Sequence, residues 1–136
     1  MTDPELVLKK IAVVETCVIE LQRLARPDRL ADDIKERRFV ERTLQVALQA
    51  VLDVCSHIVS DERLGEPATN RDLVRTLAVH GWLSARLGDT LQKMVGFRNI
   101  LVHDYDDVNV GILRSIVERH LVDLEAFAAQ VRSRLS

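Results

Sequence analysis

The sequence predicts an all-α protein, a bundle of about five helices that forms a single domain over residues 1–136. Apolar residues recur at alternating steps of four and three, the period of a helix with one buried face, and no segment shows the alternation of a strand. Leu, Ala and Arg, which favour helices, are frequent, whereas glycines number 5 and prolines 3. A length of 136 residues suits one hydrophobic core.

Two long helices are predicted in the N-terminal half. The first runs from about Pro4 to Ala25 and is capped by Asp3, because proline suits the first helical position and aspartate accepts hydrogen bonds from free backbone N–H groups. Its apolar stripe consists of Val7, Ile11, Val14, Val18, Leu21 and Ala25. After a turn at Pro27 and Asp28, the second helix runs from about Leu30 to Ser60. Its apolar stripe comprises Val40, Leu44, Ala47, Val51, Cys55 and Ile58, and its opposite face carries Glu41, Gln45, Gln49 and Asp53.

A loop with Gly65 and Pro67 follows the second helix. Asn70 is expected to cap a short third helix, which ends at Gly81, where glycine is favoured. Ser84 is expected to cap a fourth helix through "ARLGDTLQKMVGFRNILV". The third and fourth helices are therefore predicted to be close neighbours.

A fifth helix is expected from about Val108 to Leu135, with Asp106 or Asp107 as its cap. Its stripe consists of Leu113, Val117, His120, Leu124, Phe127 and Val131. His120 is the polar member of that stripe, and we interpret it as a satisfied core or interface group. Several stripes are broad, so a dimer interface could use the excess apolar surface.

The bulk properties restrict the function classes. The net charge of −2 gives no general argument for nucleic-acid binding, so any RNA contact requires a local basic patch. The N-terminus does not resemble a signal peptide, and no apolar run approaches the roughly 18 residues of a membrane span, so we expect a cytoplasmic protein. Cys17 and Cys55 are interpreted as reduced core thiols. No metal-binding spacing is present, and no cofactor is expected.

The segment "GFRNILVHDYDD", residues 96–107, differs from a packing pattern because it gathers Arg98, Asn99, His103, Asp104 and Tyr105. Each helical residue turns by about 100°, so Arg98 and His103, five steps apart, point about 140° from each other. One straight helix therefore cannot bring these side chains together. Either the chain curls back after His103, or a second copy supplies the missing half across a twofold axis.

An arginine and a histidine in one cleft suit RNA cleavage without a metal. A base takes the proton of the ribose 2′-hydroxyl, that oxygen attacks the adjacent phosphate, and an acid protonates the leaving oxygen. Arginine binds the phosphate and offsets its developing charge. The alternative from spacing alone is structural: His103 stabilises a helix end, Arg98 is solvated, and Tyr105 packs under a loop.

Arginine, four residues, histidine, one residue and tyrosine, in "RNILVHDY", resemble the signature of HEPN-domain proteins and, within them, of the HepT-like toxins. The likeness extends in order through "ERTLQVALQAVLDVCSHIVSD", "NRDLVRTLAVHGWLSARLGDTL" and "MVGFRNILVH", which together with the motif cover much of the chain. The resemblance implies a HEPN-like helical bundle, a homodimer and a metal-independent ribonuclease toxin. It also implies an antitoxin partner, an MntA-like nucleotidyltransferase that silences the toxin by AMP transfer.

Carried over by residue, the resemblance makes Arg98 and His103 catalytic and Tyr105 the acceptor of AMP, with Asn99 and Asp104 in support. An AMP group two residues from His103 would block the cleft and engage Arg98. The acids Asp104, Asp106 and Asp107 could hold magnesium, but helix capping is the simpler interpretation.

A charge run at the start of the second helix, "KERRFVER", is the densest basic cluster. It is a solvated face or an RNA-backbone contact through Arg37, Arg38 and Arg42. Two other functions stay open beside the ribonuclease. One is a non-catalytic HEPN-type nucleotide- or substrate-binding partner of a nucleotidyltransferase, and the other is a plain helical interaction domain.

Overall fold

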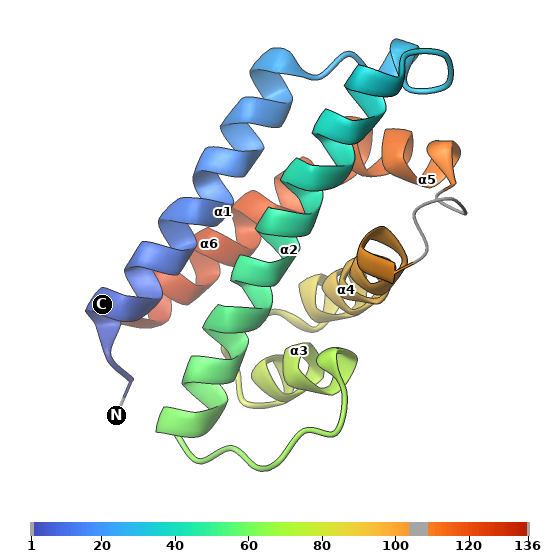
Figure 1. Ribbon diagram of the computed structural model, residues 1–136. Coiled ribbons are helices and arrows are strands. Elements are labelled where there is room, and N and C mark those ends of the chain that lie inside the picture. Colours follow the sequence, from blue (N-terminus) through green and yellow to red (C-terminus); the bar gives the residue numbers. More distant parts are fainter. Residues whose placement is uncertain (1, 104–108, 136) are drawn as a thin grey trace.

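The computed structural model confirms the predicted all-α fold (Figure 1). It describes residues 2–103 and 109–135, and the side chains of residues 2–101 and 109–135. The helices in these ranges are α1 (Pro4–Leu24), η1 (Pro27–Arg29), α2 (Ile34–Asp61), α3 (Asn70–Val79), α4 (Ala85–His103), α5 (Val110–Ser115), η3 (Ile116–His120) and α6 (Leu121–Leu135). The fifth predicted helix corresponds to α5, η3 and α6, which follow one another without a break.

The long helix α2 is the centre of the bundle, because it contacts α1 along one side and α3 and α4 along another (Figure 1). Helix α6 lies behind α1, and both ends of the chain lie at the same end of the molecule. By length and composition α2 could cross a membrane, which the sequence pattern had not suggested, but 61% of its most apolar window is buried within the fold. Its length and apolar composition therefore serve the core, where Leu44, Leu48 and Val54 are fully buried.

The predicted start signals hold for α1 and α4. Asp3 accepts a hydrogen bond at its Oδ1 from the Glu5 backbone N–H at 3.1 Å, and Ser84 Oγ accepts one three residues on at 3.2 Å. Gly81 follows α3 with φ +81°, the left-handed conformation that glycine adopts most easily. Helix α2 begins four residues after the predicted start, because a short 3₁₀ turn precedes it and Asp33 caps it.

Two predicted caps are wrong. Thr69, not Asn70, caps α3: its hydroxyl accepts from the N–H three residues on at 3.1 Å, and Asn70 is already helical. Asn109 caps α5 in the same way at 3.1 Å. The predicted caps Asp106 and Asp107 precede this position and lie outside the described residues. Asn and Thr are good N-caps in their own right, so neighbouring candidates compete and sequence alone does not rank them.

Helices α3 and α4 approach each other closely at two glycines of α4. A Cβ at Gly88 would lie 2.7 Å from the Cβ of Ala78, well inside van der Waals contact. A Cβ at Gly96 would lie 2.6 Å from Nη2 of Arg71, whose guanidinium rests over the glycine. The absence of a side chain at Gly88 therefore sets how near α3 can lie to α4, whereas at Gly96 it leaves room for the movable guanidinium of Arg71.

The turn η3 is π-helical, and it changes which residues of the last helix reach the core. A π turn holds more than four residues, so the buried series passes from Val117 to Leu121. His120, predicted in the apolar stripe, is left at the margin with its side chain 37% exposed. The predicted satisfaction of its imidazole is confirmed, because Nδ1 lies 2.8 Å from Oδ2 of Asp123.

Candidate functional site

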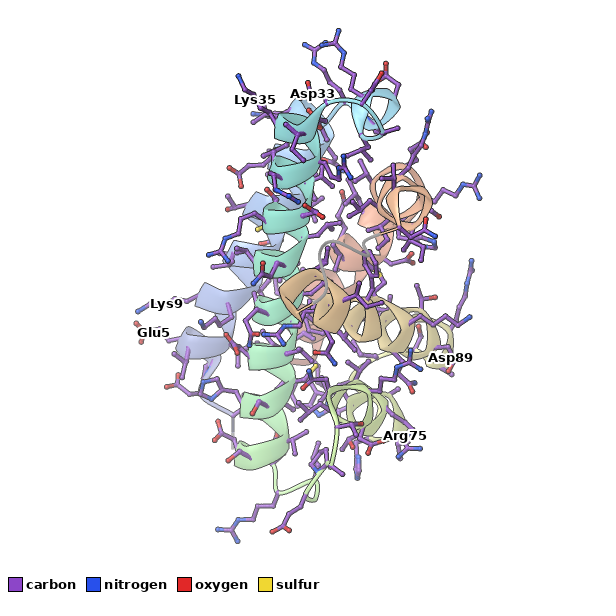
Figure 2. The ribbon with its side chains drawn as sticks, turned by 45° about the vertical axis from the view of Figure 1, so that its right-hand side comes forward. Glu5, Lys9, Asp33, Lys35, Arg75 and Asp89 are labelled. Atoms are coloured by element: carbon purple, nitrogen blue, oxygen red, sulfur yellow. The ribbon has the colours of Figure 1, made fainter. Side chains whose placement is uncertain are left out.

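Helix α4 packs against α2 (Figure 2). Arg98, near the C-terminal end of α4, is turned towards the middle of α2. Its Nη2 donates to the Oε1 of Gln49, and its Nη1 donates to the Oδ1 of Asn99 at 3.4 Å. The Nε of Arg98 is buried and has no acceptor among the described residues. An unpaired buried donor costs about 1–3 kcal/mol, so this guanidinium is incompletely satisfied in the protein alone.

A chain of polar contacts continues from Gln49 to the first helix. Gln49 Nε2 donates to the Oδ1 of Asp53 at 2.9 Å, one turn further along α2. The second carboxylate oxygen of Asp53 lies 3.1 Å from Nζ of Lys10 on α1. Because the amide oxygen of Gln49 faces Arg98 and its amide nitrogen faces Asp53, the arginine is fixed without a carboxylate among the side chains that the structure describes. Three helices thus hold the arginine of the motif.

These groups line a cavity of about 220 Å³ between α1, α2 and α4. Arg42 and Gln45, on the same face of α2, also line it. Arg42 is exposed, and no ion pair joins it to another residue in the part of the chain that the structure describes. Of the three basic residues predicted to contact RNA, Arg42 is therefore the one that shares a cavity with Arg98.

The other two predicted RNA contacts lie elsewhere on α2. Arg38 Nη1 forms an ion pair with Oε1 of Glu41 at 2.8 Å. Glu41 is only 6% exposed, and its other carboxylate oxygen is buried without a partner, so Arg38 offsets an otherwise uncompensated buried charge. Arg37 is half-buried, and its Nε has no acceptor in the ranges that the structure describes. Neither Arg37 nor Arg38 is a lining residue of the cavity that Arg42 shares with Arg98.

His103 is the last residue of α4, five residues after Arg98 and about 140° from it around the helix. Its side chain, and the predicted site residues Asp104 and Tyr105, lie outside the described residues. Asn99 is exposed beside Arg98 and accepts its hydrogen bond. The structure thus gives the arginine half of the predicted site in atomic detail, with position 103 placed one and a half turns beyond it.

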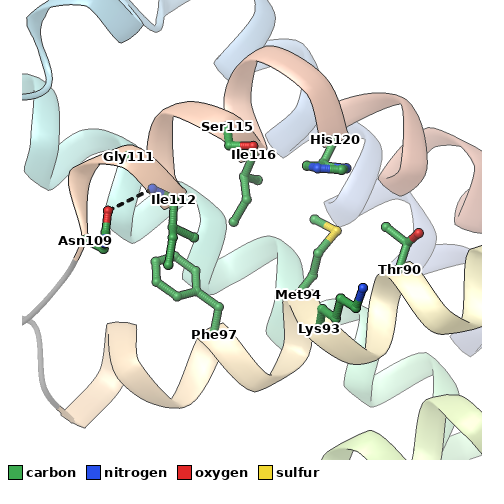
Figure 3. A pocket seen from close by; sticks show the side chains of 10 residues that line it. All are labelled: Thr90, Lys93, Met94, Phe97, Asn109, Gly111, Ile112, Ser115, Ile116 and His120. Atoms are coloured by element: carbon green, nitrogen blue, oxygen red, sulfur yellow. Dashed lines mark hydrogen bonds between the residues drawn. The ribbon is translucent and has the colours of Figure 1, made fainter.

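A second cavity, of about 410 Å³, lies between α4 and the α5–η3 segment (Figure 3). Its walls are largely apolar, with Met94 and Phe97 on α4 opposite Ile116. Lys93 and His120 stand at one end of it on opposite walls. This cavity and the Arg98 cavity have no described lining residue in common, so they are separate.

Both cysteines are free and buried, as the sequence predicted. Burial raises the pKa of the Cys55 thiol far above its ordinary value, and burial together with Glu20 raises the pKa of Cys17. Neither is therefore a nucleophile at neutral pH. Within residues 2–103 and 109–135 no group of three or more His, Cys, Asp or Glu side chains could hold a metal ion.

Sequence reasoning did not identify Lys10, Gln49 and Asp53 as site residues. Gln49 and Asp53 belong to the polar face of α2, and such a face normally lies in solvent. One signal in the sequence could have identified them. Glu41, Gln45, Gln49 and Asp53 follow one another at steps of four and form a polar stripe on a helix that is too long to lie wholly at the surface.

Comparison with known proteins identifies relatives along most of the chain. The model of the family described as Ribonuclease HepT-like matches residues 14–131. The mRNA nuclease HepT of Shewanella oneidensis is 32% identical over 130 residues, which cover 95% of this chain and 98% of that protein. The tRNA nuclease HepT of Aphanizomenon flos-aquae is 28% identical over 108 residues, which cover 79% of this chain and 74% of that protein.

Among solved structures, the tri-AMPylated HEPN toxin of Shewanella oneidensis in complex with its MNT antitoxin superposes with a TM-score of 0.87 at 33% identity, covering 98% of this chain and 99% of that one. The fold is that of a HEPN toxin, with an arginine held near the end of α4. The chain belongs to the ribonuclease HepT-like family.

Proposed function

We propose that the protein is the toxin of a toxin–antitoxin pair and acts as a metal-independent endoribonuclease in the cytoplasm. The observation that carries the proposal is the setting of Arg98: a guanidinium held by a neutral glutamine in a polar cavity, five residues before His103. Its positive charge stays available for a phosphate. The related HepT proteins named as mRNA and tRNA nucleases support RNA as the substrate.

In the proposed reaction His103 transfers protons and Arg98 binds the scissile phosphate. The ribose 2′-oxygen loses its proton to a base and attacks phosphorus, and the 5′-oxygen of the next nucleotide leaves with a proton from an acid. The products are a 2′,3′-cyclic phosphate and a free 5′-hydroxyl. Arg98 offsets the charge that develops on the non-bridging oxygens, while Asn99 and Asp104 support the two main groups.

The site is completed across a homodimer. Arg98 is fixed against α2, and position 103 lies about 140° away on the same helix, so one copy does not bring both to one phosphate. A twofold axis near the end of α4 would bring the arginine of one copy to the histidine of the other. Exposed apolar side chains on α1, such as Leu6 and Val13, provide surface for such contacts.

Tyr105 is the proposed regulatory residue. Its hydroxyl oxygen attacks the α-phosphorus of ATP on the antitoxin, pyrophosphate leaves, and the phenolic proton passes to a base, so an AMP phosphodiester remains. The added negative phosphate would occupy Arg98 and exclude RNA. The AMPylated relative in complex with its MNT antitoxin supports this partner and this chemistry.

The main experiment compares wild type, His103→Ala and His80→Ala on RNA in the presence of EDTA. His80 is exposed, and its Nδ1 lies 2.9 Å from its own helix at Thr76 O, so its removal is a matched control. Wild type and His80→Ala should cut equally, and His103→Ala should lose at least about 10²-fold in rate. Equal cutting by all three would refute the proposed role, and no cutting by wild type would favour the non-catalytic binding partner.

A mixing experiment tests the composite site. Arg98→Ala and His103→Ala chains are each inactive alone, but unfolding and refolding them together at equal amounts forms heterodimers with one intact Arg–His pair. Random pairing should restore about a quarter of wild-type activity if the site spans two copies. No recovery in confirmed heterodimers would contradict the composite site.

A further inference from the structure

The cavity between α1, α2 and α4 carries an excess of positive charge. Lys10, Arg42 and Arg98 line it, and Asp53 is the single carboxylate among its described lining residues. Asp53 is already engaged, at 3.1 Å by Lys10 and at 2.9 Å by Gln49. Two guanidinium groups therefore face the cavity without an acidic partner among the residues the structure describes.

The hydrogen bonds of Arg98 leave that charge intact. The two acceptors of its terminal nitrogens, Gln49 Oε1 and Asn99 Oδ1, are amide oxygens. Its Nε is buried and meets no acceptor within the described part of the chain. A glutamate at position 49 would reach the same place and would neutralise the arginine. The amide instead holds Arg98 in position without compensating its charge.

We propose that this cavity is a phosphate-binding subsite in which Arg98 and Arg42 bind one phosphate group, with Gln49 as the positioning residue and Lys10 as the group that keeps Asp53 from competing. A phosphate offers several acceptors to the terminal nitrogens of two arginines. The cavity of about 220 Å³ has room for a phosphate group. The identity of the ligand as an RNA phosphate rests on the proposed function.

The first test uses inorganic phosphate, which needs no cleavage. Wild-type protein is titrated with phosphate at low ionic strength, and binding is followed by calorimetry and by the amide shifts of α2 and α4. Arg42→Met is compared with Arg119→Met, a matched control on an exposed arginine of η3 that lines neither cavity. Arg42→Met should weaken phosphate binding about tenfold, as expected for a lost charged hydrogen bond, and Arg119→Met should change it less than twofold.

The second test separates charge from packing at position 49. Gln49→Glu should form an ion pair with Arg98 and weaken phosphate binding tenfold or more, by about the effect of a charged contact. Gln49→Ala removes the contact but leaves the positive charge, so it should weaken binding only about threefold. Circular dichroism and urea unfolding establish that each variant is folded. Wild-type affinity in both Gln49→Glu and Arg42→Met would overturn the proposal.

RNA distinguishes the source of the phosphate. If it belongs to the RNA substrate, Arg42→Met raises KM with kcat nearly unchanged, whereas His103→Ala lowers kcat. Phosphate binding that depends on Arg42 and Gln49 in a protein that cuts no RNA would support the subsite and refute the ribonuclease. RNA cleavage by a protein in which neither variant affects phosphate or KM would refute the subsite alone.

Discussion

Replacing Gly88 by alanine should loosen the contact between α3 and α4. The new Cβ would lie 2.7 Å from the Cβ of Ala78, about 1 Å closer than carbon atoms pack. Such overpacking of an interior costs about 1–3 kcal/mol, because two backbones must move apart. Alanine regains about 1 kcal/mol of helix propensity over glycine. The net loss of unfolding free energy is therefore about 1 kcal/mol, with an upper limit of about 2 kcal/mol.

A methyl exchange across the interface isolates this contact. Ala78→Gly alone should cost about 1–2 kcal/mol, from helix propensity and the lost methyl group. In the double variant Gly88→Ala/Ala78→Gly, the methyl group moves from one helix to the other and the overlap disappears. The double variant should lie within about 1 kcal/mol of wild type, and so be more stable than the sum of the single variants predicts. Gly96→Ala is the control, because its neighbour is the movable end of Arg71, and it should be neutral or stabilising.

Urea unfolding at one fixed protein concentration measures all four variants, since dimer formation would couple stability to concentration. The reasoning would be refuted if the double variant lost as much as the two single variants together. It would also be refuted if Gly96→Ala were as destabilising as Gly88→Ala, because the loss would then not come from the rigid Cβ–Cβ contact.

Other parts of the fold give three further predictions. Bidentate hydrogen bonds from Arg132 at 2.8 Å lower the pKa of Glu15 below its ordinary value of 4.5. The pair therefore stabilises the folded state above pH 4.5, and this contribution is lost as the pH falls through the lowered pKa. Glu15→Gln should therefore cost less than about 1 kcal/mol at pH 7, the pair being exposed, and nothing in stronger acid, as urea unfolding at both pH values would measure. The buried Cys55 thiol should resist iodoacetamide in the native protein and react only on unfolding, as mass spectrometry of the alkylated peptide would show. The guanidinium of Arg134 lies 5.1 Å from the ring centre of Trp82, so Arg134→Ala should alter tryptophan fluorescence and cost about 0.5–1 kcal/mol in urea unfolding.

The sequence predicted the long helices well because their signal is local. Every apolar position assigned to the stripe of α2, from Val40 to Ile58, is buried, and so are those of α1 from Val7 to Leu21. A repeat of four and three is read within one segment and does not depend on what the helix packs against. The same holds for the caps of α1 and α4. Pro4 at the first helical position selects Asp3 over the neighbouring Thr2, and Ser84 is the capping residue directly before α4.

The site was predicted in part, since the motif identified Arg98 but not the residues that hold it. Gln49 is 49 positions away in sequence, and its pairing with Arg98 depends on how α4 crosses α2. A polar residue on a helix face has the same local pattern whether it meets water or a guanidinium. The sequence also did not predict that Leu121, and not His120, is the buried residue of this turn. The change results from a π turn, and no local residue type requires a π turn.

The π turn also has a consequence for how related sequences align. From Val110 to Leu135 the helix contains one residue more than an uninterrupted α-helix with the same two ends would need, and the surplus falls within η3. Removing one residue there would restore the regular period and keep Leu113 and Leu124 on buried faces. A relative that is shorter by one residue in this region should therefore show its alignment gap inside this helix, although gaps are normally placed in loops. Such a relative should lack a residue equivalent to the partly exposed His120.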